Sequence, residues 1–497
     1  MRVWCPVDSS CPGGVRVQAI IGRSVEGTRC GVRAAAVRGG RLALVVAFIL
    51  SILAGVVQPS QASAAETVVQ VPTDENGMPT QTYFPETGHH LAGELLTAWR
   101  STGLMIFGYP ISEPMREDGR VVQYFERARL EHWPEYKDTQ WEVQGSLLGN
   151  WVAEKRRNEP AFRPLPPNQP SDSSDRVFYK ETGHWLAYGM KKYWDENGGL
   201  WQFGFPISEE FQEKNAQDGK TYTVQYFERA RFEFHPEHIG TEFEILLGHL
   251  GRDYAVDQKI DQKLVSQQPD AVRYNTALFE DALLDAFRPN AGRWMGFVST
   301  DALGIRSVPA TDTPSVDVVY NRRPIEVRGI VRGSEVEGTD AWYIVGDNEY
   351  VSAAYIDPLI LRTPSQTFDG HWVDVNLSQF YAVAYDGNTP VYVAIIAAGR
   401  DGKTPTGVYQ VQYQVRSEVM DSATVGIPVG SPGYYLLENV EFTQYFLSGG
   451  YAMHGNYWTP EANFGGFTSN GCVGLMNVDA EFFWNWMNPG DYISIHF

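Results

Sequence analysis

The segment that decides how this chain is interpreted is 451–475, YAMHGNYWTPEANFGGFTSNGCVGL. In it, His454 lies on a predicted strand and Cys472 follows Gly471 in a glycine-flanked turn. A cysteine nucleophile needs a base or a cationic neighbour to lower its pKa from about 8.5. His454 is the only histidine within residues 372–495, which makes it the candidate base. Gly471 lets backbone N–H groups converge on one point, which predicts an oxyanion hole beside the thiol.

The first 65 residues are expected to be a signal peptide. Several arginines precede the apolar run 42–57, and small residues around Ala64 and Ala65 fit a cleavage site. The apolar run is shorter than the roughly 20 residues that a stable membrane span requires. We therefore predict an exported protein of the cell wall or extracellular space, whose contact with a membrane is through this segment. An uncleaved N-terminal anchor is the alternative.

Export changes what the cysteines can do. Three of the four cysteines lie within residues 1–65, so Cys472 alone remains after cleavage and cannot form an internal disulfide. The options left are an intermolecular bond, an inert buried thiol or a reactive thiol. The net charge of −20 argues against nucleic acid as the main partner.

An internal repeat dominates the first half of the chain. VQYFERARLEHWPE begins at Val122 and VQYFERARFEFHPE begins at Val224. The repeats predict two α+β modules, residues 66–157 and 176–255, joined by a Pro- and Ser-rich linker, 158–175. Residues 256–295 read as a polar connector.

The repeats are rich in aromatic residues. Trp133, Trp185 and Trp201 either stack on sugar rings or form the core of each module, and the core interpretation is favoured. The histidines of 235–238 form an H-x-x-H pattern that the first copy lacks, and a proline interrupts it, so we predict no metal site.

The second half of the chain is expected to be mainly β. Residues 296–362 resemble a bacterial SH3-like small barrel, with GIRSVP at 304–309 and AWYIV at 341–345. Residues 370–497 alternate in the manner of a β-sandwich, with a hairpin at the D-G-N turn and one short helix after Cys472, for which Asn477 is the expected N-cap. The sequence thus predicts a multidomain, mainly β protein.

The C-terminal segment closely resembles the L,D-transpeptidase (YkuD-type) family. His454-Gly455 is followed by Ser469-Asn470-Gly471-Cys472-Val473, and GRDGKTPTG at 399–407 resembles the family's glycine and Thr-Pro turn. NYW at 456–458 and NFG at 463–465 match further elements in the same order.

The resemblance implies roles for individual residues. Cys472 would be the nucleophile and His454 the general base and acid, with no cofactor. Oxyanion binding and orientation would fall to four residues: Gly471, Asn470, Ser469 and Tyr435. The substrate-groove candidates are Gly455, Tyr457 and Trp458. Asn470 stands where the family usually has a second His, and Gly474 where it has Arg or Asn.

The implied activity is the formation of 3→3 cross-links in peptidoglycan through a cysteine thioester. Stem peptides would be both donor and acceptor. The repeats and the SH3-like segment would either bind wall glycan or peptide or serve as spacers. An L,D-carboxypeptidase and a catalytically weak wall-binding protein are the alternatives. A serine penicillin-binding type is excluded, since no lysine has a serine three positions before it.

Overall fold

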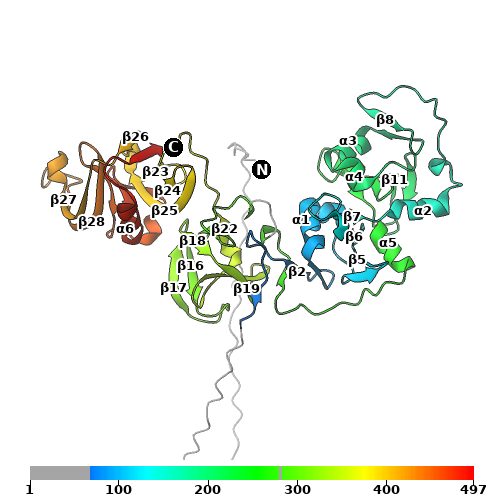
Figure 1. The fold of residues 1–497 in the computed structure, drawn as a ribbon, viewed down its shortest axis with the longest axis horizontal. Coiled ribbons are helices and arrows are strands. Elements are labelled where there is room, and N and C mark those ends of the chain that lie inside the picture. Colours follow the sequence, from blue (N-terminus) through cyan, green and yellow to red (C-terminus); the bar gives the residue numbers. More distant parts are fainter. Residues whose placement is uncertain (1–67, 279–282) are drawn as a thin grey trace, which may run out of the picture. The chain divides into compact units, whose positions relative to one another are not determined.

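The computed structural model describes residues 68–278 and 283–497, so the predicted signal peptide lies outside the described residues. No helix in the described ranges is long and apolar enough to cross a membrane. The described chain is mainly β and contains several sheets with few helices, which confirms the predicted fold class (Figure 1).

Each repeat contains a β-hairpin, a helical segment, a four-stranded antiparallel sheet and a closing helix. The first comprises β2 (Gln81–Phe84), β3 (His89–Ala92), α1 (Gly93–Phe107), β4 (Met115–Glu117), β5 (Arg120–Tyr124), β6 (Arg129–His132), β7 (Val143–Gly145) and α2 (Leu148–Arg156). The second comprises β8 (Arg176–Tyr179), β9 (His184–Ala187), α3 (Tyr188–Glu196), α4 (Gly199–Phe203), β10 (Phe211–Lys214), β11 (Thr221–Tyr226), β12 (Arg231–Phe234), β13 (Ile245–Leu247) and α5 (Leu250–Asp257).

The closing helices are exchanged between the repeats. Leu148 of α2 packs with Tyr222 and Val224 on the sheet of the second repeat. Ala255 of α5 packs with Val122 on the sheet of the first repeat, and Figure 1 shows α5 beside β5. Each sheet therefore buries its apolar face under a helix that follows the other sheet in the chain.

Equivalent hydrogen bonds cross this junction in both directions. Arg127 Nε donates to the carbonyl of Leu247 at 3.2 Å, and Arg229 Nε donates to the carbonyl of Gly145 at 3.0 Å. These arginines occupy the same place in the two FERAR sequences, so the repeated motif encodes the contact between the copies.

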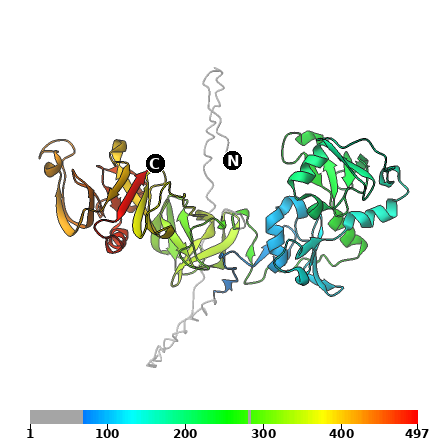
Figure 2. The same ribbon diagram turned by 45° about the horizontal axis from the view of Figure 1, so that its top comes forward.

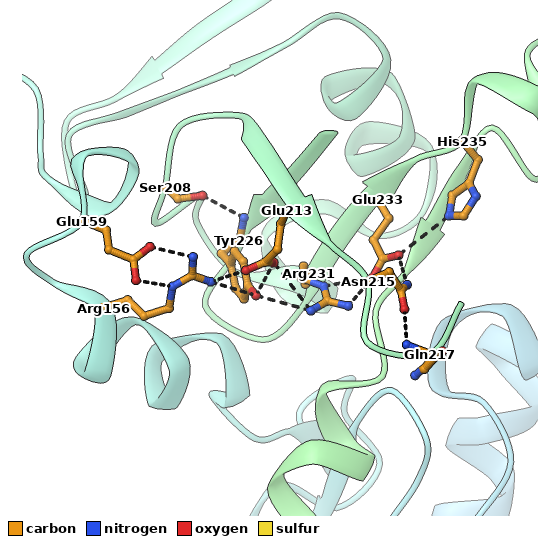
Figure 3. A network of polar contacts seen from close by, with 10 residues as sticks. All are labelled: Arg156, Glu159, Ser208, Glu213, Asn215, Gln217, Tyr226, Arg231, Glu233 and His235. Atoms are coloured by element: carbon orange, nitrogen blue, oxygen red, sulfur yellow. Dashed lines mark hydrogen bonds and ion pairs between the residues drawn. The ribbon is translucent and has the colours of Figure 1, made fainter. Parts of the chain in front are cut away.

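A polar network also holds α2 against the second repeat (Figure 3). Arg156 of α2 pairs with Glu159 and with Glu213 on β10. Glu213 also accepts a hydrogen bond from Tyr226 at 2.8 Å, so the carboxylate joins the helix to two strands. Because Arg156 and Glu213 are largely buried, their attraction is screened less than that of a surface pair.

The three tryptophans singled out in the repeats all contact protein groups. The Arg120 guanidinium lies 3.5 Å from the Trp133 ring centroid, and that of Arg176 lies 4.7 Å from the Trp185 centroid. Trp201 Nε1 donates to a backbone carbonyl of the first repeat at 2.9 Å. None of these three rings is among the buried core residues of the described chain, and each is half-buried, so the core interpretation is wrong for them. Sugar binding by them stays a prediction.

The exchanged helices generate a stability prediction. A Cβ on Gly251 would overlap the carbonyl oxygen of Phe125, whereas a Cβ on Gly145 would meet an arginine methylene at an ordinary 3.6 Å. We expect Gly251→Ala to lower the free energy of unfolding by about 1–3 kcal/mol through overpacking. Urea denaturation measures the change. Gly145→Ala is the matched control, and equal losses in the two variants would contradict the close packing of α5.

The middle β-domain, which we define as residues 294–358, contains two sheets. Its strands are β15 (Trp294–Val298), β16 (Ala302–Arg306), β17 (Ser315–Tyr320), β18 (Pro324–Val327), β19 (Gly329–Val336), β20 (Thr339–Gly346), β21 (Glu349–Ser352) and β22 (Ile356–Pro358). One sheet has the order β1-β19-β20-β21-β16-β17 and the other the order β18-β15-β22. Its likeness to an SH3 domain stays a prediction.

Two short pairings differ from the predicted boundaries. β1 (Gln70–Val71) was expected in the first repeat module but pairs with β19, where Val71 is buried. β14 (Val272–Arg273), in the predicted connector, runs parallel to β2. Both strands are only two residues long, too short to show an alternating pattern, so their partners could not be predicted.

The C-terminal domain is one continuous set of strands joined through a long central strand. Its elements are β23 (His371–Asn376), β24 (Tyr381–Asp386), β25 (Thr389–Gly399), β26 (Gly407–Gln410), β27 (Tyr413–Asp421), β28 (Leu436–Leu447), β29 (Tyr451–Gly455), β30 (Gly466–Ser469), β31 (Val473–Leu475), α6 (Asn477–Trp486) and β32 (Tyr492–His496). The order is β26-β32-β23-β24-β25-β31-β29-β28-β27, with β30 also beside β25. Both views show β32, the red strand, within this domain (Figure 1, Figure 2).

The central strands are buried on both faces. Ile396 belongs to the core that includes Phe483 of α6, whereas Ile395 belongs to a cluster with Phe287 and Leu359 beside the middle β-domain. Double burial explains the nearly continuous apolar run of β25.

The predicted hairpin is confirmed, with Asp386 opposite Thr389. The predicted N-cap is wrong. Asn477 is the first residue of α6, and its side-chain amide donates to Glu441 instead of capping the helix.

Candidate functional site

Cys472 and His454 are brought together by the pairing of two short strands. β29 and β31 run parallel, with Met453 opposite Val473 and His454 opposite Gly474. Cys472 directly precedes β31, so its thiol lies at the entrance of that strand. Both side chains line one cavity of about 510 Å³.

His454 is held in a defined tautomer. Its Nδ1 lies 2.9 Å from the carbonyl oxygen of Gly455, and a carbonyl can only accept, so Nδ1 carries the hydrogen. Nε2 is then the nitrogen with a free lone pair. Burial lowers the pKa of His454, which favours the neutral imidazole. The Trp458 ring stacks on the imidazole with centroids 5.5 Å apart.

Cys472 has contacts typical of a neutral thiol. Its Sγ donates to the carbonyl of Gly450 at 3.4 Å and accepts the backbone N–H of Ala452. Burial raises the pKa of Cys472 to about 11, with the Glu418 carboxylate adding to the rise and the Ala452 N–H opposing it. This is the reverse of the lowered pKa expected from the sequence, because apolar surroundings and a nearby anion both disfavour the thiolate.

Ser469 fixes the turn that carries the thiol. Its hydroxyl donates to the carbonyl of Cys472 at 2.7 Å and accepts the N–H of Gly471 at 3.2 Å. Gly471 has a φ of +141°, and a Cβ there would lie 2.8 Å from the Tyr451 ring. Glycine is therefore required at this position. Since its N–H is already bonded to Ser469, oxyanion binding by Gly471 would need that bond to open.

Of the other predicted site residues, some line the cavity and some do not. Tyr435, Asn470 and Trp458 line the cavity. Burial raises the pKa of Tyr435, as does the nearby Cys472.

Gly455 and Tyr457 do not line the cavity. Tyr457 turns away and donates from its hydroxyl to the carbonyl of Glu438 at 2.7 Å. Gly455 is buried and instead holds the imidazole through its carbonyl.

Several residues at the cavity were not predicted from the sequence. Arg400, Met420 and Ile427 line the cavity, and the charge of Glu418 acts on the thiol. Arg400 belongs to the Thr-Pro turn whose resemblance was noted, so its position was available as a signal. Residues 418–427 carry no motif, and only the fold brings them here.

The departure at Gly474 has a steric explanation. A Cβ on Gly474 would lie 2.6 Å from the side-chain nitrogen of Asn456, which is itself buried. Asn456 accepts the N–H of Thr459 and so shapes the segment that carries Trp458. A larger side chain at Gly474 would displace this amide.

One group of possible metal ligands lies outside the cavity. Glu94, His132 and Glu142 place their ligand atoms within 4.8 Å of one another. Glu94 is exposed, and the second repeat has Gly189 and Phe234 at two of the equivalent positions, so the group is not a feature of both copies.

The cavity and its elements can be compared with known proteins. The family described as YkuD, L,D-transpeptidase catalytic domain, matches residues 370–495. Those residues belong to this family.

Among relatives of this chain, probable L,D-transpeptidase 3 of Mycobacterium tuberculosis is 37% identical over 92 residues, 18% of this chain and 34% of that protein. L,D-transpeptidase 2 of the same species is 33% identical over 99 residues, 20% of this chain and 24% of that protein. The chain thus spans about a third and about a quarter of the length of these two relatives. A crystal structure of L,D-transpeptidase 3 has a TM-score of 0.25 at 24% identity and covers 33% of this chain and 77% of that one.

The position of Glu418 generates a prediction for the L,D-transpeptidase domain. We expect Glu418→Gln to lower the pKa of the Cys472 thiol, because the substitution removes a nearby negative charge. Below that pKa the alkylation rate follows the thiolate fraction, so iodoacetamide labelling at pH 8 should speed up about two- to tenfold.

The labelling is followed by intact mass. Glu441→Gln, on the neighbouring β28, is the matched control because its carboxylate is bonded to Asn477. If both variants are labelled at pH 8 at the same rate as the unaltered protein, Glu418 does not act on the thiol.

Proposed function

We propose that this protein is a peptidoglycan L,D-transpeptidase that forms 3→3 cross-links through a Cys472 thioester. The observation that supports it most directly is the cavity itself. Within a domain of the transpeptidase family, a lone thiol and a neutral histidine of fixed tautomer line the same space. Relatives named as L,D-transpeptidases are 37% and 33% identical to this chain over 92 and 99 residues.

The resting site favours general-base attack over a preformed ion pair. The thiol pKa is raised and the imidazole pKa is lowered, so both groups are neutral near pH 7. As Cys472 Sγ attacks the carbonyl carbon of the third residue of a stem tetrapeptide, Nε2 of His454 accepts the thiol proton. Transfer during attack avoids a buried thiolate and imidazolium in the free enzyme.

The tetrahedral intermediate then collapses to the thioester. The carbonyl oxygen carries the negative charge, and the hydroxyl of Tyr435 is a donor on the same cavity wall. The C–N bond to the terminal D-amino acid breaks, and the leaving amine takes the proton from His454. His454 therefore serves as base in the first half and as acid in the second.

The acceptor decides the product. A side-chain amine of a second stem peptide attacks the thioester, His454 accepts the amine proton, and Cys472 recovers its hydrogen as the new amide forms. Water in place of the amine would give a tripeptide, the L,D-carboxypeptidase outcome. Export through residues 1–65 and wall binding by the repeats and the middle β-domain belong to the same proposal.

The product test uses a disaccharide tetrapeptide and the chain without residues 1–65. We expect a cross-linked dimer with loss of one D-amino acid, identified by mass. Cys472→Ala should form no acyl adduct and no dimer. His454→Gln should keep the fold and lower turnover about 10²- to 10⁴-fold, since it removes the base. Tripeptide as the sole product would indicate hydrolysis, and an acyl adduct in Cys472→Ala would overturn the proposal.

The two neutral groups also predict a pH profile. Turnover requires unprotonated His454, whose pKa is lowered from 6.5. We therefore expect activity to persist to below pH 6.5 and to fall as the pH drops through this lowered pKa. Initial rates between pH 4.5 and 8 measure the midpoint. A midpoint above 6.5 would show that His454 is not the buried group described here.

A further inference from the structure

The charge of the cavity is unlike that of the chain. The whole chain has a net charge of −20, yet Arg400 is the one Asp, Glu, Lys or Arg side chain that lines the cavity of Cys472. The Glu418 carboxylate acts on the thiol through its charge and does not line this space. The cavity therefore presents a single cation to a ligand and no anion.

The backbone places Arg400 at the rim on the side of the thiol. β25 and β30 run parallel with Gly399 opposite Ser469, so Arg400 and Asn470 each follow their strand at the same end. Both side chains are exposed and line the cavity. Asn470 is two residues before Cys472, so this rim is close along the chain to the reacting sulfur.

The turn that carries Arg400 is held independently of its side chain. The N–H of Gly399 donates to the hydroxyl of Thr404 at 2.7 Å, and the N–H of Lys403 donates to the carbonyl of Arg400 at 3.1 Å. Asp401 has a φ of +56°, which tightens the turn.

The guanidinium itself is unengaged. Within residues 68–278 and 283–497 no carboxylate forms an ion pair with Arg400, whereas Arg416 of the same domain pairs with Glu481 and lies over Phe442. Arg400 is thus positioned by its backbone while its donors remain open to the cavity.

We propose that Arg400, with the Asn470 amide beside it, binds the C-terminal carboxylate of the donor tetrapeptide. Guanidinium donors match a carboxylate in a bidentate manner, and an amide NH₂ donates at every pH. The leaving residue of such a peptide carries its carboxylate one residue beyond the scissile carbonyl, a span of at most about 3.6 Å. The proposal rests on the proposed transpeptidase function and assigns its donor specificity.

The carboxylate contact would select peptide length. A tetrapeptide stem ends one residue after the attacked carbonyl, whereas a pentapeptide ends two residues after it and carries its charge past Arg400. A donor with a C-terminal carboxamide has the right length but no charge. The site should therefore prefer the free tetrapeptide over both.

The test compares three donors that are identical except for one group: the free tetrapeptide, its C-terminal carboxamide, and the tetrapeptide amidated on the side-chain carboxylate of its third residue. For Arg400→Gln we expect kcat/KM for the free tetrapeptide to fall about 10- to 100-fold through KM, the effect of losing a charge-assisted hydrogen bond. The carboxamide should react at the same slow rate with both proteins. Lys403→Gln, a cation in the same turn that does not line the cavity, is the matched control and should change neither rate.

Binding measured on Cys472→Ala separates this proposal from the proposed function, because it needs no chemistry. Calorimetry should show tighter binding of the free tetrapeptide than of the carboxamide, and Cys472→Ala/Arg400→Gln should abolish the difference. If the unaltered enzyme makes no product while this difference stands, the transpeptidase proposal fails and the carboxylate site survives.

Three results would overturn the carboxylate site. Arg400→Gln could weaken all donors equally, it could retain the preference for the free tetrapeptide, or the preference could follow the third-residue carboxylate. The first would make Arg400 a structural residue, and the last would assign the guanidinium to a different part of the donor.

Discussion

The parallel pairing of β29 with β31 is the contact on which the site depends. Through it the chain closes the segment between His454 and Cys472 into a loop whose two ends lie on adjacent strands. The residues within the loop then have no freedom to separate the two groups. Trp458 stacks on the imidazole, and Ser469 ties the turn to the carbonyl of Cys472. Each of these contacts contributes little to the free energy of unfolding. Each one fixes the end of a strand that the pairing of β29 with β31 has already positioned.

Burial in this place has a chemical cost. The same apolar packing that fixes the strands removes water from the thiol and the imidazole, so that both charged forms are disfavoured. In the proposed reaction, Cys472 would therefore stay protonated until a substrate arrives. A protonated thiol is also less open to oxidation, since the thiolate is the form that oxidants attack.

The sequence revealed the site better where the chain is continuous than where distant segments meet. Cys472, His454 and Ser469 lie within one motif, and the structure places them together. Met420 on the cavity wall and Glu418 near the thiol carry no local pattern, because the pairing of β27 with β28 brings both to this place. The raised thiol pKa was missed for the same reason. A histidine nearby suggested activation, whereas desolvation by residues remote in sequence has the larger effect.

In the fold too, local features were predicted from the sequence and contacts between distant segments were not. The β24–β25 hairpin and the two repeats were predicted from local turns and from similarity between segments. The exchange of α2 and α5 was not, since either helix would satisfy the same apolar pattern on its own sheet or on the other. The shared position of Arg127 and Arg229 in the motif was visible, but its meaning depends on a contact between the copies.

The two-residue strand β1 has a mechanical consequence. It joins the start of the described chain directly to β19 of the middle β-domain, so everything between residues 71 and 294 is a side loop of that domain. Tension applied between residue 70 and the C-terminal domain would pass through β1 and β19 and bypass the repeats, which would carry no load until this pairing ruptured. After rupture the repeats would enter the line of force and lengthen the tether. The pairing of β1 with β19 would therefore set the force at which the repeats begin to extend.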